Sequence, residues 1–253
     1  MTEAPAAREP YIRLATPADL EALAELATAA FIDDAVLYYW GGIQSPLVND
    51  PSLPARQHFH AFQRHTNLDC FAAGSRTTVV AVPSPSGSGA GEEIIAMTIF
   101  LPPRQRMCKT IEEGMRSGIM DVVVGWGESW LQRLGGYMDV SVRSLEDAFR
   151  AKGVRETPLD VWYLQVACVH PQHQRKGYLT KLVREMYAFA PNSIMTLDST
   201  SAKSKAVYEK LGFEVVKHIT SGEGSVNEKG LPAEGEEAKG VSGYSMVKWA
   251  DRS

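Results

Sequence analysis

The clearest pattern in the chain lies between residues 160 and 186, where the spacing of the apolar positions changes. An apolar, β-branched run over 160–169 predicts a strand that ends at a polar turn containing Pro171. Beyond the turn, apolar residues recur at offsets of three, four and seven, at Leu179, Leu182, Val183 and Met186. Because such offsets place side chains on one helical face, the predicted order is strand, turn and amphipathic helix.

The turn itself is basic and contains a glycine. It reads Gln174-Arg175-Lys176-Gly177-Tyr178-Leu179-Thr180. The first N–H groups of a helix have no intrahelical partner, and the helix dipole is positive at that end. A basic turn that enters a helix therefore predicts a phosphate-binding site.

The same reasoning predicts the other elements of the chain. Helices are expected at 16–31, 54–66 and 204–211, the last ended by Gly212, and strands at 11–14, 71–82, 94–101, 193–199, 213–219 and 243–249. A low-complexity link over 83–91 predicts a flexible hairpin loop. The expected organisation is one domain over 1–253 with a central sheet.

Two segments do not fit a simple alternation of strands and helices. Residues 102–158 show mainly helical spacing and predict a helical insert that packs against the substrate face. Residues 220–242 are rich in Gly, Glu and Lys and predict a flexible loop.

Composition and charge exclude several classes of protein. The chain has 253 residues, of which 44% are hydrophobic, and a net charge of −4, which disfavours charge-driven binding to nucleic acid. Three widely spaced cysteines, Cys70, Cys108 and Cys168, predict reduced thiols and neither disulfides nor a metal site. No secretory signal pattern and no apolar run of about 18 residues is present, so we expect a cytoplasmic protein without membrane contact, with the nucleus as the alternative.

Two motifs together resemble the GNAT superfamily of acyl-CoA-dependent N-acetyltransferases. The first, Gln174 to Leu179, is similar to the family's Q/R-x-x-G-x-G/A turn. The second, Ala206-Val207-Tyr208-Glu209-Lys210-Leu211-Gly212-Phe213, follows about 30 residues later and is similar to its L-Y-E-K-L-G-F signature. The resemblance implies an α/β fold with a mixed, mainly antiparallel central sheet flanked by helices. The overall pattern, including the long helical insert, looks most like fungal members.

The resemblance also implies the co-substrate acetyl-CoA, no metal, and a set of cofactor-binding residues. That set is Ala167, Cys168, Val169, Arg175, Lys176, Gly177, Tyr178, Leu179, Thr180, Ser201 and Ser204. Leu179 departs from the family, which has Gly or Ala there, so its side chain has to point into the helix core while its N–H faces phosphate. Of Ser201 and Ser204, one is expected to cap the following helix instead.

The resemblance further assigns Tyr208 as the general acid that protonates the leaving thiolate. Gln165 stands where many relatives have a glutamate base, and a neutral amide can only orient water or substrate. The base stays open among Asp33, Asp34, Glu128, Asp198, Tyr163 and a water relay. Cys168 suggests a covalent acyl-enzyme, but no histidine is paired with it in the sequence, which favours direct attack.

The predicted function is transfer of an acetyl group from acetyl-CoA to an amine of a small molecule or peptide. Two alternatives are a non-catalytic acyl-CoA-binding regulatory module and a protein or histone acetyltransferase. The sequence leaves open the acceptor, the oligomeric state and whether the insert forms a lid.

Overall fold

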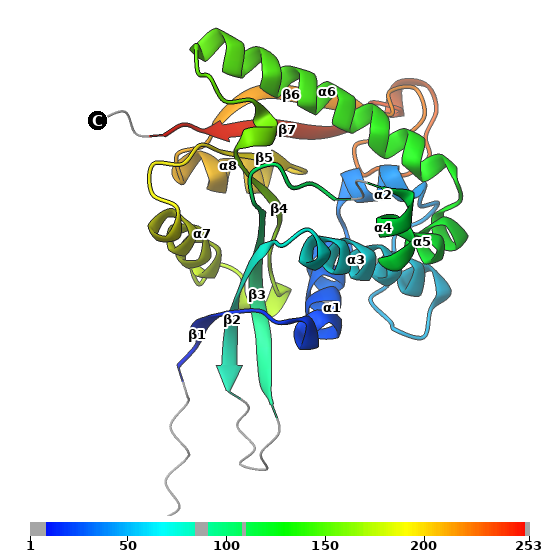
Figure 1. Cartoon of the computed structure of the whole chain (residues 1–253). Coiled ribbons are helices and arrows are strands. Elements are labelled where there is room, and N and C mark those ends of the chain that lie inside the picture. The colour runs from blue at the N-terminus through cyan, green and yellow to red at the C-terminus, as the bar shows by residue number, and fades with distance from the viewer. Residues whose placement is uncertain (1–8, 84–90, 108–109, 251–253) are drawn as a thin grey trace, which may run out of the picture.

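The protein is organised around one seven-stranded sheet in the order β1-β2-β3-β4-β5-β7-β6 (Figure 1). The computed structural model describes residues 9–83, 91–107 and 110–250. The strands are β1 (Tyr11–Leu14), β2 (Arg76–Pro83), β3 (Glu92–Leu101), β4 (Trp162–Val169), β5 (Met195–Ser199), β6 (Glu214–Ser221) and β7 (Val241–Lys248). Neighbouring strands are antiparallel except β4 and β5, which are parallel. The prediction of a mixed, mainly antiparallel sheet is confirmed.

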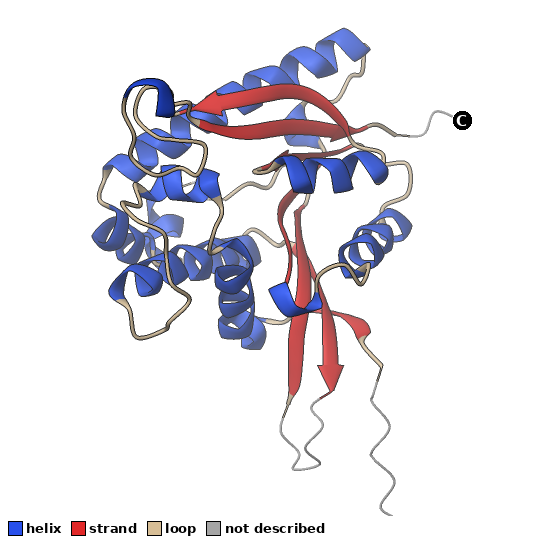
Figure 2. Cartoon of the chain, turned by 180° about the vertical axis from the view of Figure 1, so that it is seen from behind, coloured by secondary structure: helices blue, strands red, loops and turns tan. Residues whose placement is uncertain are grey.

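Helices cover both faces of this sheet (Figures 1 and 2). They are α1 (Leu20–Phe31), α2 (Ala35–Gly41), α3 (Pro54–Ala72), α4 (Ile111–Arg116), α5 (Ile119–Trp126), α6 (Ser129–Lys152), α7 (Tyr178–Phe189) and α8 (Ala202–Lys210). Helices α7 and α8 lie on one face, where Met186 and Tyr208 pack against Leu164 and Leu197. Helices α1 and α3 lie on the other face.

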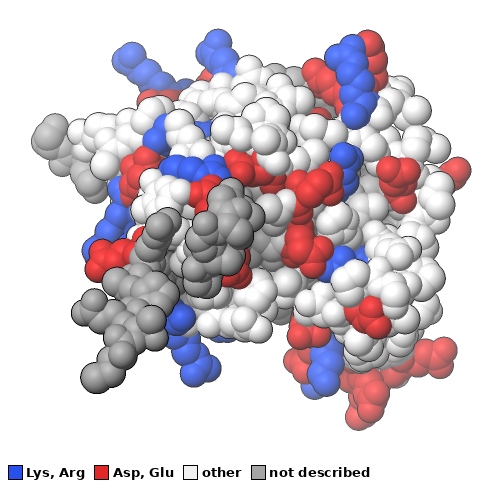
Figure 3. Space-filling view, turned by 90° about the horizontal axis from the view of Figure 1, so that it is seen from below, with Lys and Arg blue, Asp and Glu red and all other residues white. Residues whose placement is uncertain are grey.

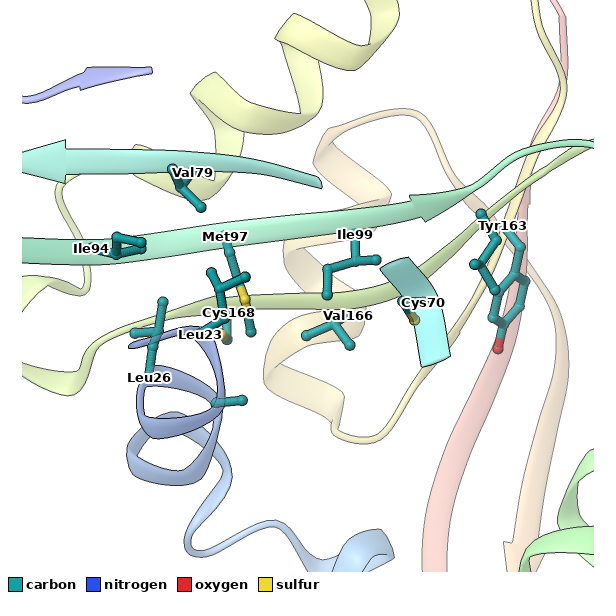
Figure 4. Close-up of a cluster of buried hydrophobic side chains, with 12 residues drawn as sticks. Leu23, Leu26, Cys70, Val79, Ile94, Met97, Ile99, Tyr163, Val166 and Cys168 are labelled. Carbon is teal, nitrogen blue, oxygen red and sulfur yellow. The ribbon is translucent and has the colours of Figure 1, made fainter. Parts of the chain in front are cut away.

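Figure 4 shows the core between α1, α3 and the sheet. Leu23 from α1 and Cys70 from α3 pack there against Met97, Val166 and Cys168 of β3 and β4. Cys70 and Cys168 are both buried in this cluster, and Cys108 lies outside the described residues. Side chains of β4 thus alternate between the two faces, which fixes what each position can contribute to a site.

Two predicted elements were placed wrongly. Helix α3 does not end near residue 66 but continues to Ala72, because Cys70 extends the buried face of the helix. The following strand therefore starts at Arg76 instead of at residue 71. Gly74, at φ +73°, separates the two elements. Helix α2, which contains Tyr38, Tyr39 and Trp40, is not among the elements expected from the sequence.

The predicted hairpin is present, since β2 and β3 pair along their length. Residues 84–90 of its loop lie outside the described residues, so the loop's flexibility is still a prediction.

The 102–158 segment contains α4, α5 and α6, and α6 lies along β6 and β7 (Figure 1). The 220–242 segment makes defined contacts: Val226 pairs with Pro232, and Leu231 packs beside α2 and α3. Gly230, at φ +76°, approaches α2 so closely that a Cβ would stand 2.1 Å from the carbonyl oxygen of Ala35. Flexibility of this loop stays a prediction, and its close approach to α2 is an additional finding.

Candidate functional site

The sheet forks between β4 and β5. These two strands pair only where Trp162–Leu164 lies beside Met195–Leu197. Just beyond, the ladder between β3 and β4 shifts its register, because Ile99 pairs with Val166 while Phe100 pairs with Leu164. Gln165 is the extra residue of this β-bulge, and a bulge bends its strand away from its neighbour. The rest of β4 therefore has an open edge on the side of β5.

The open edge presents the backbone groups of particular residues. The N–H of His170, directly after β4, donates to the carbonyl of Ile95 in β3 at 2.8 Å. Since backbone groups alternate in direction along a strand, those of Cys168 also face β3, whereas those of Ala167 and Val169 face the open edge. Of the three main-chain contacts expected from the sequence, Ala167 thus presents its backbone groups to a ligand in the fork and Val169 presents its N–H, whereas the Val169 carbonyl accepts a bond from the Gln174 side chain.

The turn after β4 leaves a row of amides unpaired. Arg175 and Gly177 have φ of +64° and +79°, and Gly177 caps α7. Over the described residues, no amide from Arg175 through Thr180 donates a hydrogen bond; the first helical bond in this stretch is from Lys181 to the carbonyl of Gly177. A non-glycine residue in the left-handed region is uncommon and strained, and such residues gather at functional sites. The turn has the donors and the positive helix end that an anion requires.

Side chains around the turn agree with an anion site. Arg175, Lys176 and Gly177 are exposed, and Tyr178 and Thr180 are partly buried. Leu179 packs into the core cluster between α7, α8 and the sheet, so its side chain points away from the turn as the sequence required.

One cation near the turn was missed by the sequence analysis. The Lys203 ammonium at the start of α8 donates to the Gln174 side chain at 3.1 Å, and the Gln174 amide donates to the carbonyl of Val169 at 3.4 Å. Lys203 and Gln174 are 29 residues apart, so no local spacing could have linked them.

Tyr208 lies on α8 and is 6% exposed. Burial, followed by the nearby Cys168 thiol, raises the pKa of its phenol well above 10, so it stays protonated at neutral pH. In the described part of the chain its hydroxyl makes no hydrogen bond. Burial likewise raises the pKa of Cys168, which keeps the thiol protonated and argues against a covalent acyl-enzyme.

The two serines before and within α8 have structural partners. Ser201 is the N-cap, because its hydroxyl accepts a bond from the N–H of Ser204 at 3.1 Å. The Ser204 hydroxyl also lies 2.6 Å from that of Ser199. The prediction that one of the pair caps the helix is confirmed for Ser201, and α8 accordingly begins at Ala202.

On the opposite face, several polar groups surround the branch point of the fork. Asp198 of β5 accepts bonds from Tyr163, Ser141 and Ser245, and Asp34 accepts one from Thr200. Figure 4 shows the Tyr163 hydroxyl directed away from the hydrophobic cluster. Of the candidate bases, three lie at this place: Asp34, Asp198 and Tyr163. Asp33 and Glu128 are exposed instead. Gln165 is partly buried in the bulge.

Other kinds of site find little support. Among the described residues no three His, Cys, Asp or Glu side chains are grouped as metal ligands, and no helix is long and apolar enough to cross a bilayer. On the face shown in Figure 3, the coloured acidic and basic side chains are interspersed, so that face has no extended basic surface.

Comparison with known proteins gives a partial family match and several structures of similar fold. Residues 136–215 match the family model described as acetyltransferase (GNAT) domain. A search of curated proteins gave no significant match. Solved structures with a similar fold include a histone acetyltransferase HPA2-related acetyltransferase from Corynebacterium glutamicum, with a TM-score of 0.57 and 16% identity, covering 96% of this chain and 98% of that one.

Two insect enzymes are similar to the same extent. Arylalkylamine N-acetyltransferase 2 from Aedes aegypti gives a TM-score of 0.56 at 16% identity, covering 96% of this chain and all of that one. The polyamine N-acetyltransferase of Drosophila melanogaster gives 0.53 at 15% identity, covering 95% and 100%. These matches are bacterial and insect proteins, and the fungal resemblance stays a prediction. Residues 136–215 thus match the model of a GNAT acetyltransferase domain, and the chain shares its overall fold with these solved acetyltransferase structures.

Proposed function

We propose that this protein is an acetyl-CoA-dependent N-acetyltransferase that acetylates an amine of a small molecule or peptide by direct attack. The observation that carries the proposal is the row of unpaired amides from Arg175 to Thr180, directly beside the open edge of β4. A diphosphate needs several converging donors, and this turn supplies them at the positive end of α7.

The chain's residues can be assigned to parts of acetyl-CoA. The amides of the turn, with Arg175 and Lys176, bind the phosphates. The backbone groups of Ala167 and Val169 hold the pantetheine arm as a further strand in the fork. Tyr208 then lies on the α8 side of the fork, where the thioester sulfur is expected.

The reaction follows from these positions. A protonated acceptor first loses one proton to water, which leaves a neutral amine. The amine nitrogen then forms a bond to the acetyl carbon, a strand N–H such as that of Ala167 stabilises the oxyanion, and the carbon–sulfur bond breaks. Tyr208 donates its proton to the departing thiolate and regains one originating from the amine. Gln165, an amide in the bulge, orients water or the acceptor and does not accept a proton.

A small cationic acceptor is favoured by two lines of support. The neighbours in Aedes and Drosophila are described as acting on arylalkylamines and polyamines. Independently, two carboxylates lie on the face of the fork opposite α7 and α8, which we call the acceptor side: those of Asp34 and Asp198.

The cofactor part is tested by titrating the protein with CoA while its thermal unfolding is followed. Wild-type protein should show a rising melting temperature, and Gly177→Glu should abolish the shift by placing bulk and negative charge against the diphosphate. Gly153→Glu is the matched control, since Gly153 is also an exposed glycine with positive φ and with no atom within 4 Å of a Cβ. An equal CoA shift in both variants would show that CoA does not bind at this turn.

Turnover of acetyl-CoA with alkylamines, arylamines and histone peptides tests the catalytic part. Acetylation of an amine supports the enzyme, whereas CoA binding without turnover of any amine would favour the regulatory module. Preference for histone peptides would identify a protein acetyltransferase.

A further inference from the structure

Asp198 is held in place on the face of the sheet opposite to α7 and α8. Its carboxylate accepts hydrogen bonds from Ser141 of α6 at 2.7 Å, from Tyr163 of β4 at 2.9 Å and from Ser245 of β7 at 2.6 Å. Three hydroxyls from three elements therefore fix its orientation. The residue as a whole is nevertheless only partly buried.

This carboxylate stands at the branch point of the fork. Asp198 directly follows Leu197, which is the last β5 residue paired with β4, and Leu197 is paired with Leu164, the residue before the bulge at Gln165. Leu197 packs toward Tyr208 on the other face, so Asp198 points to the reverse side. A group bound at Asp198 and a thioester beside Tyr208 would thus meet at the branch point from opposite faces.

A second carboxylate lies nearby. Asp34 caps α2 by accepting the N–H of Leu37 at 3.0 Å, and it also accepts the hydroxyl of Thr200 at 2.5 Å. Burial raises the pKa of both Asp34 and Asp198 above the ordinary value. Within the described ranges, neither carboxylate forms an ion pair with a Lys, Arg or His. Partly buried carboxylates without a counter-ion are costly, and a bound cation offsets that cost.

An unpartnered hydroxyl points to a ligand between them. Tyr137 of α6 is 2% exposed, and no described residue hydrogen-bonds its hydroxyl. The charges of Asp198 and Asp34 both act on this phenol and add to the effect of burial in raising its pKa. The hydroxyl lies against Gly243, where a Cβ would be only 2.1 Å away, and the ring meets Trp40 edge-on at 5.3 Å. A buried hydroxyl with no partner usually has a water or ligand beside it.

We propose that Asp34, Asp198 and Tyr137 form the binding site for the ammonium group of the acceptor. This inference rests on the proposed function and names its substrate class: an alkylamine that is protonated at neutral pH, and not an arylamine, whose nitrogen is neutral. The ammonium has three donors, which match the two carboxylates and the phenol oxygen. Trp40 contributes an aromatic wall next to the cation.

The test compares two ligands of equal shape and different charge. Calorimetry on CoA-saturated protein measures binding of n-butylammonium and of n-butanol. Wild-type protein should prefer the cation by roughly tenfold or more, the range of hydrogen bonds to charged groups. Asp198→Asn and Asp34→Asn should each reduce that preference to below roughly threefold. Asp33→Asn, which changes the exposed neighbouring carboxylate, should keep it.

The variants remain interpretable if one of them folds poorly. CoA binding is measured in each as a folding control, and Asn at position 34 retains an oxygen that can cap α2. Equal affinity for the two ligands, binding of neither, or an unchanged preference in both Asp198→Asn and Asp34→Asn would overturn the proposal. CoA binding without ammonium preference refutes the ammonium site alone, whereas ammonium preference without CoA binding refutes the proposed function.

Discussion

Replacing Tyr208 by phenylalanine should separate catalysis from stability. The substitution removes one hydroxyl that, across the described chain, makes no hydrogen bond, and it leaves the ring in the core cluster that includes Phe213 and Leu197. Because no bond is lost, the free energy of unfolding should change by no more than about 0.5 kcal/mol. If the phenol protonates the thiolate, kcat should fall roughly 10²- to 10⁴-fold, which corresponds to about 3–5 kcal/mol of transition-state stabilisation.

Tyr187 provides the matched control. It is another partly buried tyrosine that packs against the same cluster, but its hydroxyl donates to the carbonyl of Leu211 at 2.8 Å. Tyr187→Phe leaves that carbonyl without its partner and should lower the free energy of unfolding by about 1–3 kcal/mol. Its kcat should stay within roughly threefold of wild type, since a change outside the reacting groups leaves the barrier within about 0.7 kcal/mol.

The assays are urea unfolding and steady-state release of CoA from acetyl-CoA with an alkylamine. The raised pKa of Tyr208 means that its proton is present throughout the range from pH 6 to 9, so the loss in the variant should not depend on pH in that range. If Tyr208→Phe keeps a kcat comparable with that of Tyr187→Phe, the assignment of Tyr208 as the acid is refuted.

Three further predictions follow from single contacts. Leu179→Ala should lower the free energy of unfolding by about 1–3 kcal/mol in a urea titration, yet change the Kd for CoA less than roughly threefold, because the side chain packs in the core. The double substitution Arg175→Ala and Lys176→Ala should raise the Kd for CoA roughly two- to tenfold, and the increase should be larger at low salt concentration. An increase that is equal at all salt concentrations would contradict a charge interaction. Hydrogen bonding from Arg13 lowers the pKa of Asp19 to about 2. Because the pair lies near the solvent, which screens it, the carboxylate should stabilise the fold by no more than about 1 kcal/mol above pH 4, and this contribution is lost as the pH falls toward 2. Asp19→Asn should remove that dependence in urea titrations at several pH values.

The turn at residues 174–180 and the elements around it could be predicted from neighbouring residues in the sequence. The change of period at residues 160–186 and the glycine at 177 depend on neighbours in the chain, and the structure agrees with the strand, the turn and the helix there. The same is true of the Ser201 cap and the Gly212 stop of α8. Where tertiary packing decided an element, as in the extension of α3 through Cys70, the apolar run at 71 was misread as a strand.

By itself, the sequence determined the fold class and the position of the glycine-containing turn between β4 and α7, because backbone geometry at such a turn depends on a few consecutive residues. Only the tertiary structure decided which side chains meet at the branch point between β4 and β5. Asp198 lies 57 positions from Ser141 and 47 from Ser245 along the chain, and Asp34 is 166 positions from Thr200. Their contacts come from the packing of α2 and α6 on β5 and β7, and no spacing along the chain encodes that packing.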